Sequence, residues 1–366
     1  MAPLDRPPVT LGAQARTKLD ALAGPLGLGS EADAIAEQIR ELLGDAADRP
    51  LEAPPAWPSD ICDDHGPFEF SVSMNRKEAV LRVLVESGPE PPTFARRQQA
   101  ARNCTESLLQ HAHAKPDRVR AIEGLFESDC ESAQFARWHA LEFRPGGRTD
   151  AKVYFNPLLQ GSEHSRYVIR ESLVRLGLDH AWPWIERLAG RDVDELKYFS
   201  LDLSDAAQAR VKIYVRHPAI DATQLEAALA GCRGVARGQT AAFLHEMTGS
   251  LGPFTANPVI TCLSWAGREQ TPSATLHVPI RGYATDDQVA FDRIYALLSR
   301  EGLPAATYAA AVRAFAGRAL DAGVGMQSYA SIKRNGDGPN VTVYLVPETY
   351  RVSPRRAVAH AMEARP

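Results

Sequence analysis

The 366-residue sequence lacks long apolar runs and paired cysteines, and both absences narrow the class of protein. No apolar stretch approaches the roughly 18 residues of a membrane-spanning helix. Residues 1–17 contain Pro and Arg where a signal peptide needs an apolar stretch, so we expect a cytoplasmic protein. The five cysteines are scattered, odd in number and without C-x-x-C spacing, which predicts reduced thiols and argues against a structural zinc site.

The sequence also lacks an excess of charge of one sign and several familiar catalytic motifs. A formal net charge of -4 gives no global attraction to nucleic acid or to an anionic membrane, so an anion site must be a local cluster of cations. The acidic pairs at 63–64 and 286–287 lack the third Asp of a magnesium-binding D-D-x-x-D motif. There is no zincin motif, Walker loop or G-x-S-x-G elbow. We therefore predict no metal site.

What the sequence contains is a repeat of strand pairs separated by helical segments. The second strands of the pairs begin about 60 to 70 residues apart. The expected strands are residues 67–73 with 79–85, 138–143 with 151–155, 197–203 with 209–215, 259–265 with 274–279, and 327–333 with 340–345. The expected helices are two within 18–44, then 94–113, 117–126, 165–188 with a break near Pro183, 221–230, 286–298 and 305–320.

Ten antiparallel strands are about as many as an open twisted sheet holds before it curls, and closure removes both edges. The sequence therefore predicts an α+β fold, a closed ten-stranded antiparallel β-barrel surrounded by helices. We expect one domain over residues 1–366, with frayed tails at 1–17 and 352–366.

The alternation of side chains along the strands predicts which face is inside. Residues two apart share one face of a strand, so Arg210, Lys212 and Tyr214 lie opposite to their apolar neighbours. Amphipathic helices need an apolar partner and should cover the apolar face, which leaves the polar face in the lumen. A ten-stranded lumen is too wide for side chains alone, so it should hold water or a ligand. The expected apolar outer positions are Val153, Phe155, Val211, Ile213, Val215, Leu276, Val278, Val341, Val343 and Leu345.

Four cations, Arg82, Lys152, Arg210 and Lys212, should converge in this lumen from three hairpins. They would repel one another without a multiply charged anion, and a diphosphate suits them through charge-assisted hydrogen bonds. The alternative is that each cation is solvated or paired with a carboxylate such as Asp202.

Tyrosines and one carboxylate form the rest of the expected site. Tyr154, Tyr214 and Tyr344, with Tyr329 on a neighbouring strand, can stabilise a cation with their ring faces and exclude water, although Tyr is also an ordinary strand residue. Glu69 stands alone among Phe, Ser and Val, where it can accept a proton or an N–H hydrogen bond from a substrate. Its alternative is a salt bridge to Arg82 on the paired strand.

Four stretches resemble motifs of the dimethylallyltryptophan synthase family of aromatic prenyltransferases, and the resemblance extends from about residue 60 to residue 350. It implies a ten-stranded barrel ringed by helices, in which an allylic diphosphate is joined to an electron-rich ring, usually indole, without an essential metal or other cofactor. The stretches are Pro67-Phe68-Glu69-Phe70-Ser71, Lys152-Val153-Tyr154, Arg210-Val211-Lys212-Ile213-Tyr214 and Thr342-Val343-Tyr344-Leu345.

The resemblance also implies roles for single residues. Glu69 and Lys152 correspond to catalytic residues, and Glu69 is the carboxylate that accepts the indole N–H. The implied diphosphate ligands are Arg82, Lys152, Arg210, Lys212, His277 and Tyr344, and the implied tyrosine shield is Tyr154, Tyr214, Tyr329 and Tyr344. One departure concerns the fourth hairpin, where many fungal members have K-x-Y and this chain has Thr275-Leu276-His277. The preference for a five- or ten-carbon prenyl chain therefore stays open.

The sequence thus predicts an enzyme that transfers a dimethylallyl or longer allylic group to the indole ring of tryptophan or of a tryptophan-derived metabolite. The expected partners are these small molecules, with no nucleic acid and no membrane, and the protein is expected to be a monomer or a homodimer. Lys197 and Trp265 are candidates for the acceptor side of the lumen. Two alternatives are a non-catalytic barrel that binds an isoprenoid diphosphate or anionic lipid, and a phenol-directed prenyltransferase.

Overall fold

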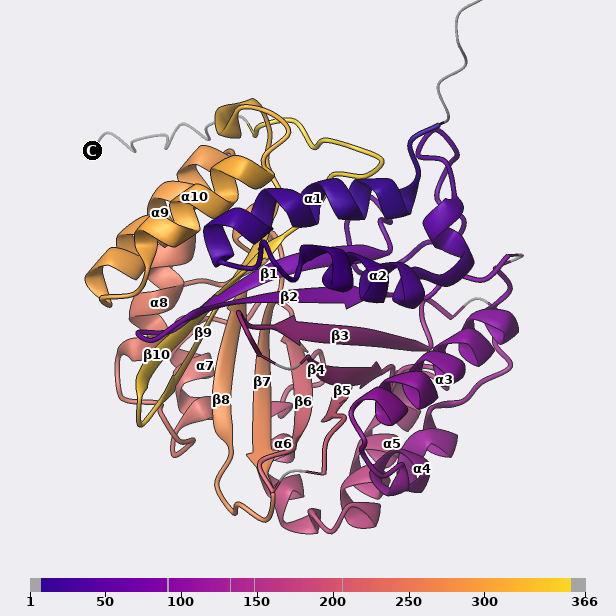
Figure 1. The fold of residues 1–366 in the computed structure, drawn as a ribbon. Coiled ribbons are helices and arrows are strands. Elements are labelled where there is room, and N and C mark those ends of the chain that lie inside the picture. The colour runs from indigo at the N-terminus through magenta and orange to yellow at the C-terminus, as the bar shows by residue number, and fades with distance from the viewer. Residues whose placement is uncertain (1–7, 91, 132, 148, 206, 357–366) are drawn as a thin grey trace, which may run out of the picture.

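A computed structural model describes residues 8–356 of the chain, apart from residues 91, 132, 148 and 206. Ten antiparallel strands close into one barrel, because each strand pairs with its sequence neighbours and β1 pairs with β10 (Figure 1). The predicted barrel is confirmed, with strand ends within about two residues of expectation. The strands are β1 Phe68–Met74, β2 Ala79–Val85, β3 Arg137–Phe143, β4 Asp150–Phe155, β5 Glu195–Asp202, β6 Arg210–His217, β7 Val259–Ala266, β8 Ser273–Val278, β9 Gln327–Asn335 and β10 Gly338–Leu345.

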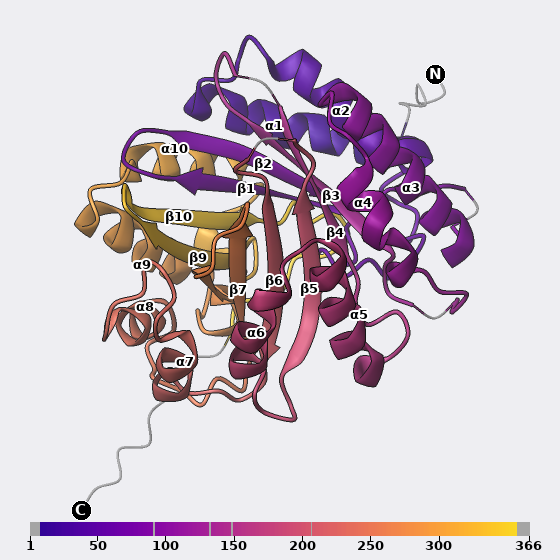
Figure 2. The same cartoon turned by 90° about the horizontal axis from the view of Figure 1, so that it is seen from below.

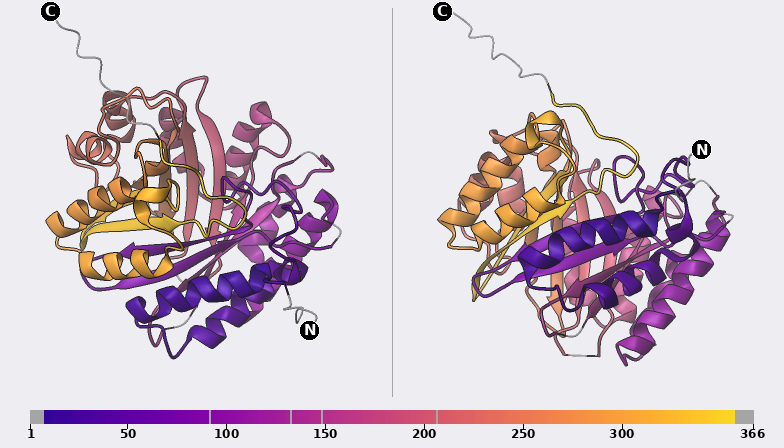
Figure 3. Two further views of the ribbon diagram at one scale, coloured as in Figure 1. Left: turned by 90° about the horizontal axis from the view of Figure 1, so that it is seen from above. Right: turned by 45° about the horizontal axis from the view of Figure 1, so that its top comes forward.

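Helices surround the barrel on its outside, as seen from below in Figure 2 and from above in Figure 3. The ten α-helices of the described residues are α1 Leu11–Leu26, α2 Ala32–Leu43, α3 Phe94–His111, α4 Asp117–Ile122, α5 Ser162–Arg175, α6 Trp182–Leu188, α7 Ala222–Leu229, α8 Gln239–Thr248, α9 Asp287–Arg300 and α10 Ala305–Phe315. Short 3₁₀ helices lie at Gly44–Asp48, Glu123–Phe126, Asp179–Ala181, Ile280–Gly282 and Leu320–Ala322. Within the described ranges, no helix is both long and apolar enough to cross a membrane.

The outer wall of the barrel forms the core with these helices. Helices α1 and α2 contact β2, α3 contacts β3, α5 contacts β5, α8 contacts β8 and α9 contacts β9. Val211, Ile213 and Val215 of β6 are each at most 2% exposed, whereas the residues between them face the lumen. Burial of this apolar wall therefore fixes which way each strand faces, since a one-residue slip would exchange the two faces.

The N-terminal tail is shorter than expected. Helix α1 begins at Leu11, with the Thr10 side chain accepting a hydrogen bond from the Ala13 N–H (3.2 Å), and Ala15 is buried. The expectation of fraying up to residue 17 is therefore wrong from residue 11 onward. At the other end, the Arg356 N–H donates to the Thr285 carbonyl (2.8 Å). The expectation of a frayed tail from residue 352 is therefore wrong for residues 352–356. Residues 1–7 and 357–366 lie outside the described residues.

Three helix expectations also need correction. The break expected at Pro183 lies earlier, after Arg175, where Gly177 has a left-handed φ of 69°, and Pro183 is in the first turn of α6. Helix α8 was not expected. Helix α10 ends at Phe315 rather than at residue 320.

Candidate active site

The lumen is a cavity of about 580 Å³ to which all ten strands contribute side chains. This volume is typical of a site for a small organic ligand. All ten site residues expected from the sequence line it, namely Glu69, Arg82, Lys152, Tyr154, Arg210, Lys212, Tyr214, His277, Tyr329 and Tyr344.

Glu142 of β3 holds the first pair of lumen cations. Its Oε2 accepts hydrogen bonds from Arg82 Nε (2.7 Å) and Lys152 Nζ (2.7 Å), and Arg144 donates to its other oxygen. Burial alone would raise the pKa of Glu142, but the three cations outweigh it and hold that pKa well below its usual range. Burial also lowers the pKa of Lys152, opposed by Glu142.

Asp202 of β5 holds the second pair. Arg210 Nε lies 2.7 Å from its Oδ2, and Lys212 Nζ lies 3.5 Å from its Oδ1. Burial would raise the pKa of Asp202, but Lys212 and Arg210 lower it overall. Burial, together with the nearby Arg210, lowers the pKa of Lys212 to about 7. Lys212 is therefore only partly protonated near neutral pH, and a bound anion would make it fully protonated.

The four cations converge as expected, and each is also paired with a carboxylate, Asp202 being one of the two, as the alternative had it. Four cations share two carboxylates, which leaves an excess of two positive charges when all are ionised. Lys333 of β9 adds a further cation to the lumen and lies opposite Thr275. We refer to Arg82, Lys152, Arg210, Lys212 and Lys333 together as the cation wall. Glu142 and Lys333 were not predicted from the sequence, although both follow the alternation: Lys333 is on the same face as Tyr329.

Aromatic rings form a layer beyond the cations. The ring centroids of Tyr154 and Tyr214 are 5.9 Å apart, those of Tyr214 and His277 5.7 Å, and those of His277 and Tyr344 5.9 Å. Tyr329 continues the layer at 6.1 Å from Tyr344. The four expected tyrosines are therefore brought together, with an imidazole between two of them.

Two further aromatic residues in the lumen were missed. Tyr198 contacts Tyr214 (5.8 Å) and Trp138 (5.2 Å). Tyr198 follows the alternation of Ser200 and Asp202, and a bulge in β5 between Leu196 and Tyr198 brings Lys197 into the lumen as well. The Trp138 indole N–H donates to Glu86 (3.2 Å), which fixes the orientation of the ring.

His277 of β8 is held at one ring nitrogen only. Its Nδ1 lies 3.2 Å from the Tyr344 hydroxyl oxygen, and its Nε2 has no hydrogen-bond partner among the described residues. Burial, with the nearby cations Lys212 and Arg82, lowers the pKa of His277 to about 3. The imidazole is therefore neutral in the ligand-free protein.

Glu69 lies apart from the cation wall. It is 8% exposed, and its partner on β2 is Leu84, while Arg82 bonds to Glu142. The alternative salt bridge from Glu69 to Arg82 is therefore wrong. Burial raises the pKa of Glu69 to about 8, although Arg281 opposes this shift.

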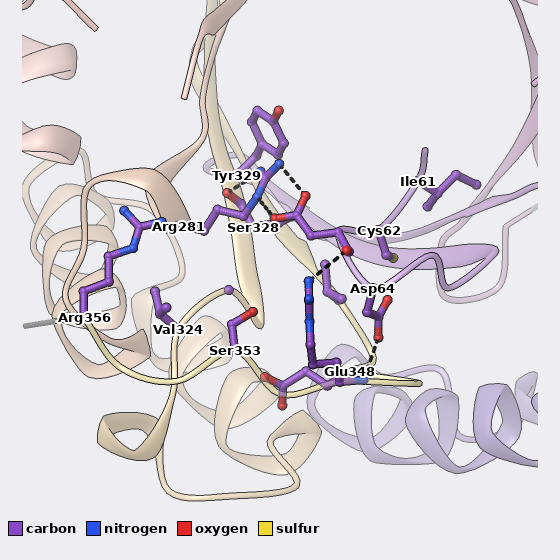
Figure 4. A pocket seen from close by; sticks show the side chains of 14 residues that line it. Ile61, Cys62, Asp64, Arg281, Val324, Ser328, Tyr329, Glu348, Ser353 and Arg356 are labelled. Carbon is purple, nitrogen blue, oxygen red and sulfur yellow. Dashed lines mark hydrogen bonds and ion pairs between the residues drawn. The ribbon is translucent and has the colours of Figure 1, made fainter. Parts of the chain in front are cut away.

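The mouth of the lumen beside Glu69 is closed in part by the loop that precedes β1. Asp63 accepts two hydrogen bonds from Arg281 (2.6 and 2.9 Å), and Arg281 lies 4.5 Å from the Tyr329 ring (Figure 4). A small pocket of about 70 Å³ lies behind this contact. Lys197 lines the lumen and pairs with Asp60 (2.9 Å).

Trp265, the other acceptor-side candidate, lies elsewhere. It is fully buried opposite Val211, on the outer face of the barrel. In the part of the chain that the structure describes, no group of three or more His, Cys, Asp or Glu is placed to hold a metal ion.

A cation wall, an aromatic layer and an isolated carboxylate inside an antiparallel barrel define the class of aromatic prenyltransferases. The sequence pattern of the tryptophan dimethylallyltransferase family matches residues 32–311. The chain belongs to this family and is a prenyltransferase.

Solved structures agree with this assignment. A 6-dimethylallyl tryptophan synthase is 32% identical, with a TM-score of 0.90 and 96% of this chain and 100% of that chain covered. The 6-dimethylallyltryptophan synthase from Micromonospora olivasterospora, in complex with DMASPP and Trp, is 33% identical (TM-score 0.88; 94% and 99% covered). The 5-dimethylallyl tryptophan synthase from Streptomyces coelicolor, in complex with the same ligands, is 28% identical (TM-score 0.87; 97% and 99% covered).

Proposed function

We propose that this protein transfers a dimethylallyl group from its diphosphate to the indole ring of tryptophan by electrophilic aromatic substitution. The observation that carries the proposal is the order of groups along the lumen. Cations line one region, the aromatic layer comes next, and Glu69 lies at the side of Arg281 and Tyr329. The cations are placed to bind the leaving group, the aromatic layer to surround an allyl cation, and Glu69 to accept the N–H of the acceptor ring.

The diphosphate is held by Arg82, Lys152, Arg210 and Lys212. The negative charge of the diphosphate joins Glu142 and Asp202 in compensating these cations, and it keeps Lys212 protonated. As the C1–O bond breaks, the electron pair goes to the diphosphate, and the same cations stabilise the charge that develops there. Lys152 acts in catalysis in this way, since it is 5% exposed and held at 2.7 Å from Glu142.

The allyl cation then lies among the tyrosine rings. Their faces stabilise it and exclude water, which would otherwise give an alcohol. Tyr344 borders both the shield and Arg82, so its hydroxyl would contact the leaving group. The sequence also predicted His277 as a phosphate ligand, but its ring lies between Tyr214 and Tyr344, within the shield.

Glu69 raises the nucleophilicity of the indole by accepting its N–H hydrogen bond. The carboxylate form is needed for this, and a carboxyl group whose pKa is near 8 is a strong acceptor once ionised. Tryptophan as the acceptor is supported by the solved relatives in complex with Trp and by the paired charges at the mouth, Lys197 with Asp60 and Arg281 with Asp63, which suit a zwitterion.

The test is incubation with dimethylallyl diphosphate and a panel of tryptophan, other indoles and phenols, followed by mass spectrometry. Tryptophan should gain one prenyl group. Glu69→Gln should bind the donor but lose about 10²- to 10³-fold in turnover. Glu163→Gln, which removes an exposed carboxylate on α5, is the matched control and should leave turnover unchanged.

Two results would overturn the proposal. If the donor binds but no acceptor of the panel gains mass, the barrel is a non-catalytic diphosphate binder. If phenols react and indoles do not, the protein is a phenol-directed prenyltransferase.

A further inference from the structure

His277 occupies a distinct position in the aromatic layer. Its ring contacts Tyr214 on one side and Tyr344 on the other. The preceding inward position on its strand, Thr275, lies opposite Lys333 and so belongs to the cation wall. His277 is therefore the next inward-facing residue of β8 after the one beside the cations. It lies in the layer where the allyl group and the acceptor ring would meet.

The free nitrogen of His277 is available for proton transfer. Nδ1 is held by the Tyr344 hydroxyl, while Nε2 is buried without a partner among the described residues and the side chain lines the lumen. A neutral imidazole has one N–H and one lone pair, and the bond at one nitrogen selects the tautomer. When Nδ1–H donates to the Tyr344 oxygen, the lone pair of Nε2 faces the lumen.

Electrophilic substitution requires such a base. After the ring carbon bonds to the allyl group, it still carries its hydrogen, and aromaticity returns only when that proton leaves. The phenols of Tyr154, Tyr214 and Tyr344 have pKa values raised by burial, so they remain protonated. Lys212 is charged when a diphosphate is bound, and Glu69 is occupied by the indole N–H.

We propose that Nε2 of His277 is the base that removes this proton from the ring carbon. The proposal rests on the prenyl transfer proposed above. The proton moves to the Nε2 lone pair, the electron pair of the C–H bond returns to the ring, and an imidazolium forms. The diphosphate, which already holds the electron pair of the broken C–O bond, stabilises this imidazolium and then takes its proton before release. This role differs from that of a phosphate ligand, which would need Nε2–H.

A kinetic isotope effect separates the two roles. Wild-type enzyme should turn over ring-deuterated and ordinary tryptophan at the same rate, because C–O cleavage precedes a fast deprotonation. In His277→Gln, kcat should fall by about 10²-fold or more, as for loss of a general base, and the deuterated substrate should react more slowly. The affinity for the unreactive thio analogue of the donor should change little. His245→Gln on the exposed face of α8 is the matched control and should behave as wild type.

Thermal melting and binding of the thio analogue show whether each variant is folded. A second variant keeps the test valid if His277→Gln does not fold. His277→Tyr keeps a polar ring at this place and should give the same isotope effect. The proposal is overturned if either folded variant loses donor affinity while the isotope effect stays at unity, since His277 is then a phosphate ligand, or if turnover is unchanged. A failure of the proposed function is distinguishable, because the wild type would then form no prenylated tryptophan.

Discussion

The replacement Glu69→Gln tests whether the raised pKa of Glu69 controls activity. With a pKa of about 8, roughly a tenth of Glu69 is ionised at pH 7, and nearly all of it at pH 9. At saturating donor, whose diphosphate keeps Lys212 protonated, kcat/KM for tryptophan reports the ionisation of the enzyme–donor complex, so its wild-type value should rise about tenfold between pH 7 and pH 9. Glu69→Gln should be low and flat over this interval, since its amide does not titrate there.

The same shift makes a prediction about stability. The pKa of Glu69 is raised in the folded protein from 4.5 to about 8, so between these pH values the folded state binds more protons than the unfolded state. The free energy of unfolding therefore falls as pH rises, by up to about 1.4 kcal/mol per pH unit. Over the whole interval the loss is at most on the order of 4 to 5 kcal/mol, and water in the lumen reduces it.

The assay is urea unfolding of both proteins at pH 5, 7 and 8.5. The stability of Glu69→Gln relative to wild type should increase with pH through this window, whereas Glu163→Gln should follow wild type. Identical pH dependence of wild type and Glu69→Gln, in both unfolding and kcat/KM, would show that Glu69 is ionised already at neutral pH and that its pKa is not raised.

Three further predictions concern the cation wall and the aromatic layer. Glu142→Gln leaves Arg82 and Lys152 without their carboxylate and should lower the free energy of unfolding by about 3 kcal/mol or more. Inorganic diphosphate should raise the melting temperature of this variant more than that of wild type, and equal shifts would contradict the idea that diphosphate takes the place of the Glu142 carboxylate. Tyr214→Leu should raise the fraction of donor lost as dimethylallyl alcohol, measured by chromatography, while Tyr214→Phe, which keeps the ring, should stay near wild type. Equal fractions of alcohol in the two variants would count against a role of the Tyr214 ring in excluding water. Removal of metal ions with EDTA should leave turnover within about twofold, because the lumen cations already neutralise the diphosphate; a loss restored by Mg²⁺ would show that they are insufficient.

Much of the fold follows from local pattern. The alternation in Arg210-Val211-Lys212-Ile213-Tyr214 sets both the strand and its orientation, since only the valine and isoleucine face can pack against helices. The same alternation predicted that eight of the ten expected site residues face the lumen, and Tyr329 and Glu69, which it did not assign, line the lumen as well. Helix α8 was missed because its sequence, Gln239–Thr248, has no strong start signal: its N-cap is Gly238, without a side-chain cap.

The pairing of charges could not be predicted from any single strand. Glu142 and Arg82 meet only because β2 and β3 are in register, and Lys152 reaches the same oxygen from β4. Lys197 lines the lumen next to Tyr198 because of a bulge, whose position is set by contacts across strands rather than by local sequence. The sequence therefore predicted which residue types reach the lumen, whereas the pairing of the strands decides which charged groups meet and how far burial shifts the pKa values of Glu69, Lys212 and His277.

The proposed arrangement of substrates is tested most directly by a crystal structure with tryptophan and the unreactive thio analogue of dimethylallyl diphosphate bound together. We expect the diphosphate against Arg82, Lys152, Arg210 and Lys212, the allyl group among the tyrosines, and the indole N–H on Glu69. A diphosphate bound away from these cations, or an indole whose N–H faces away from Glu69, would contradict it.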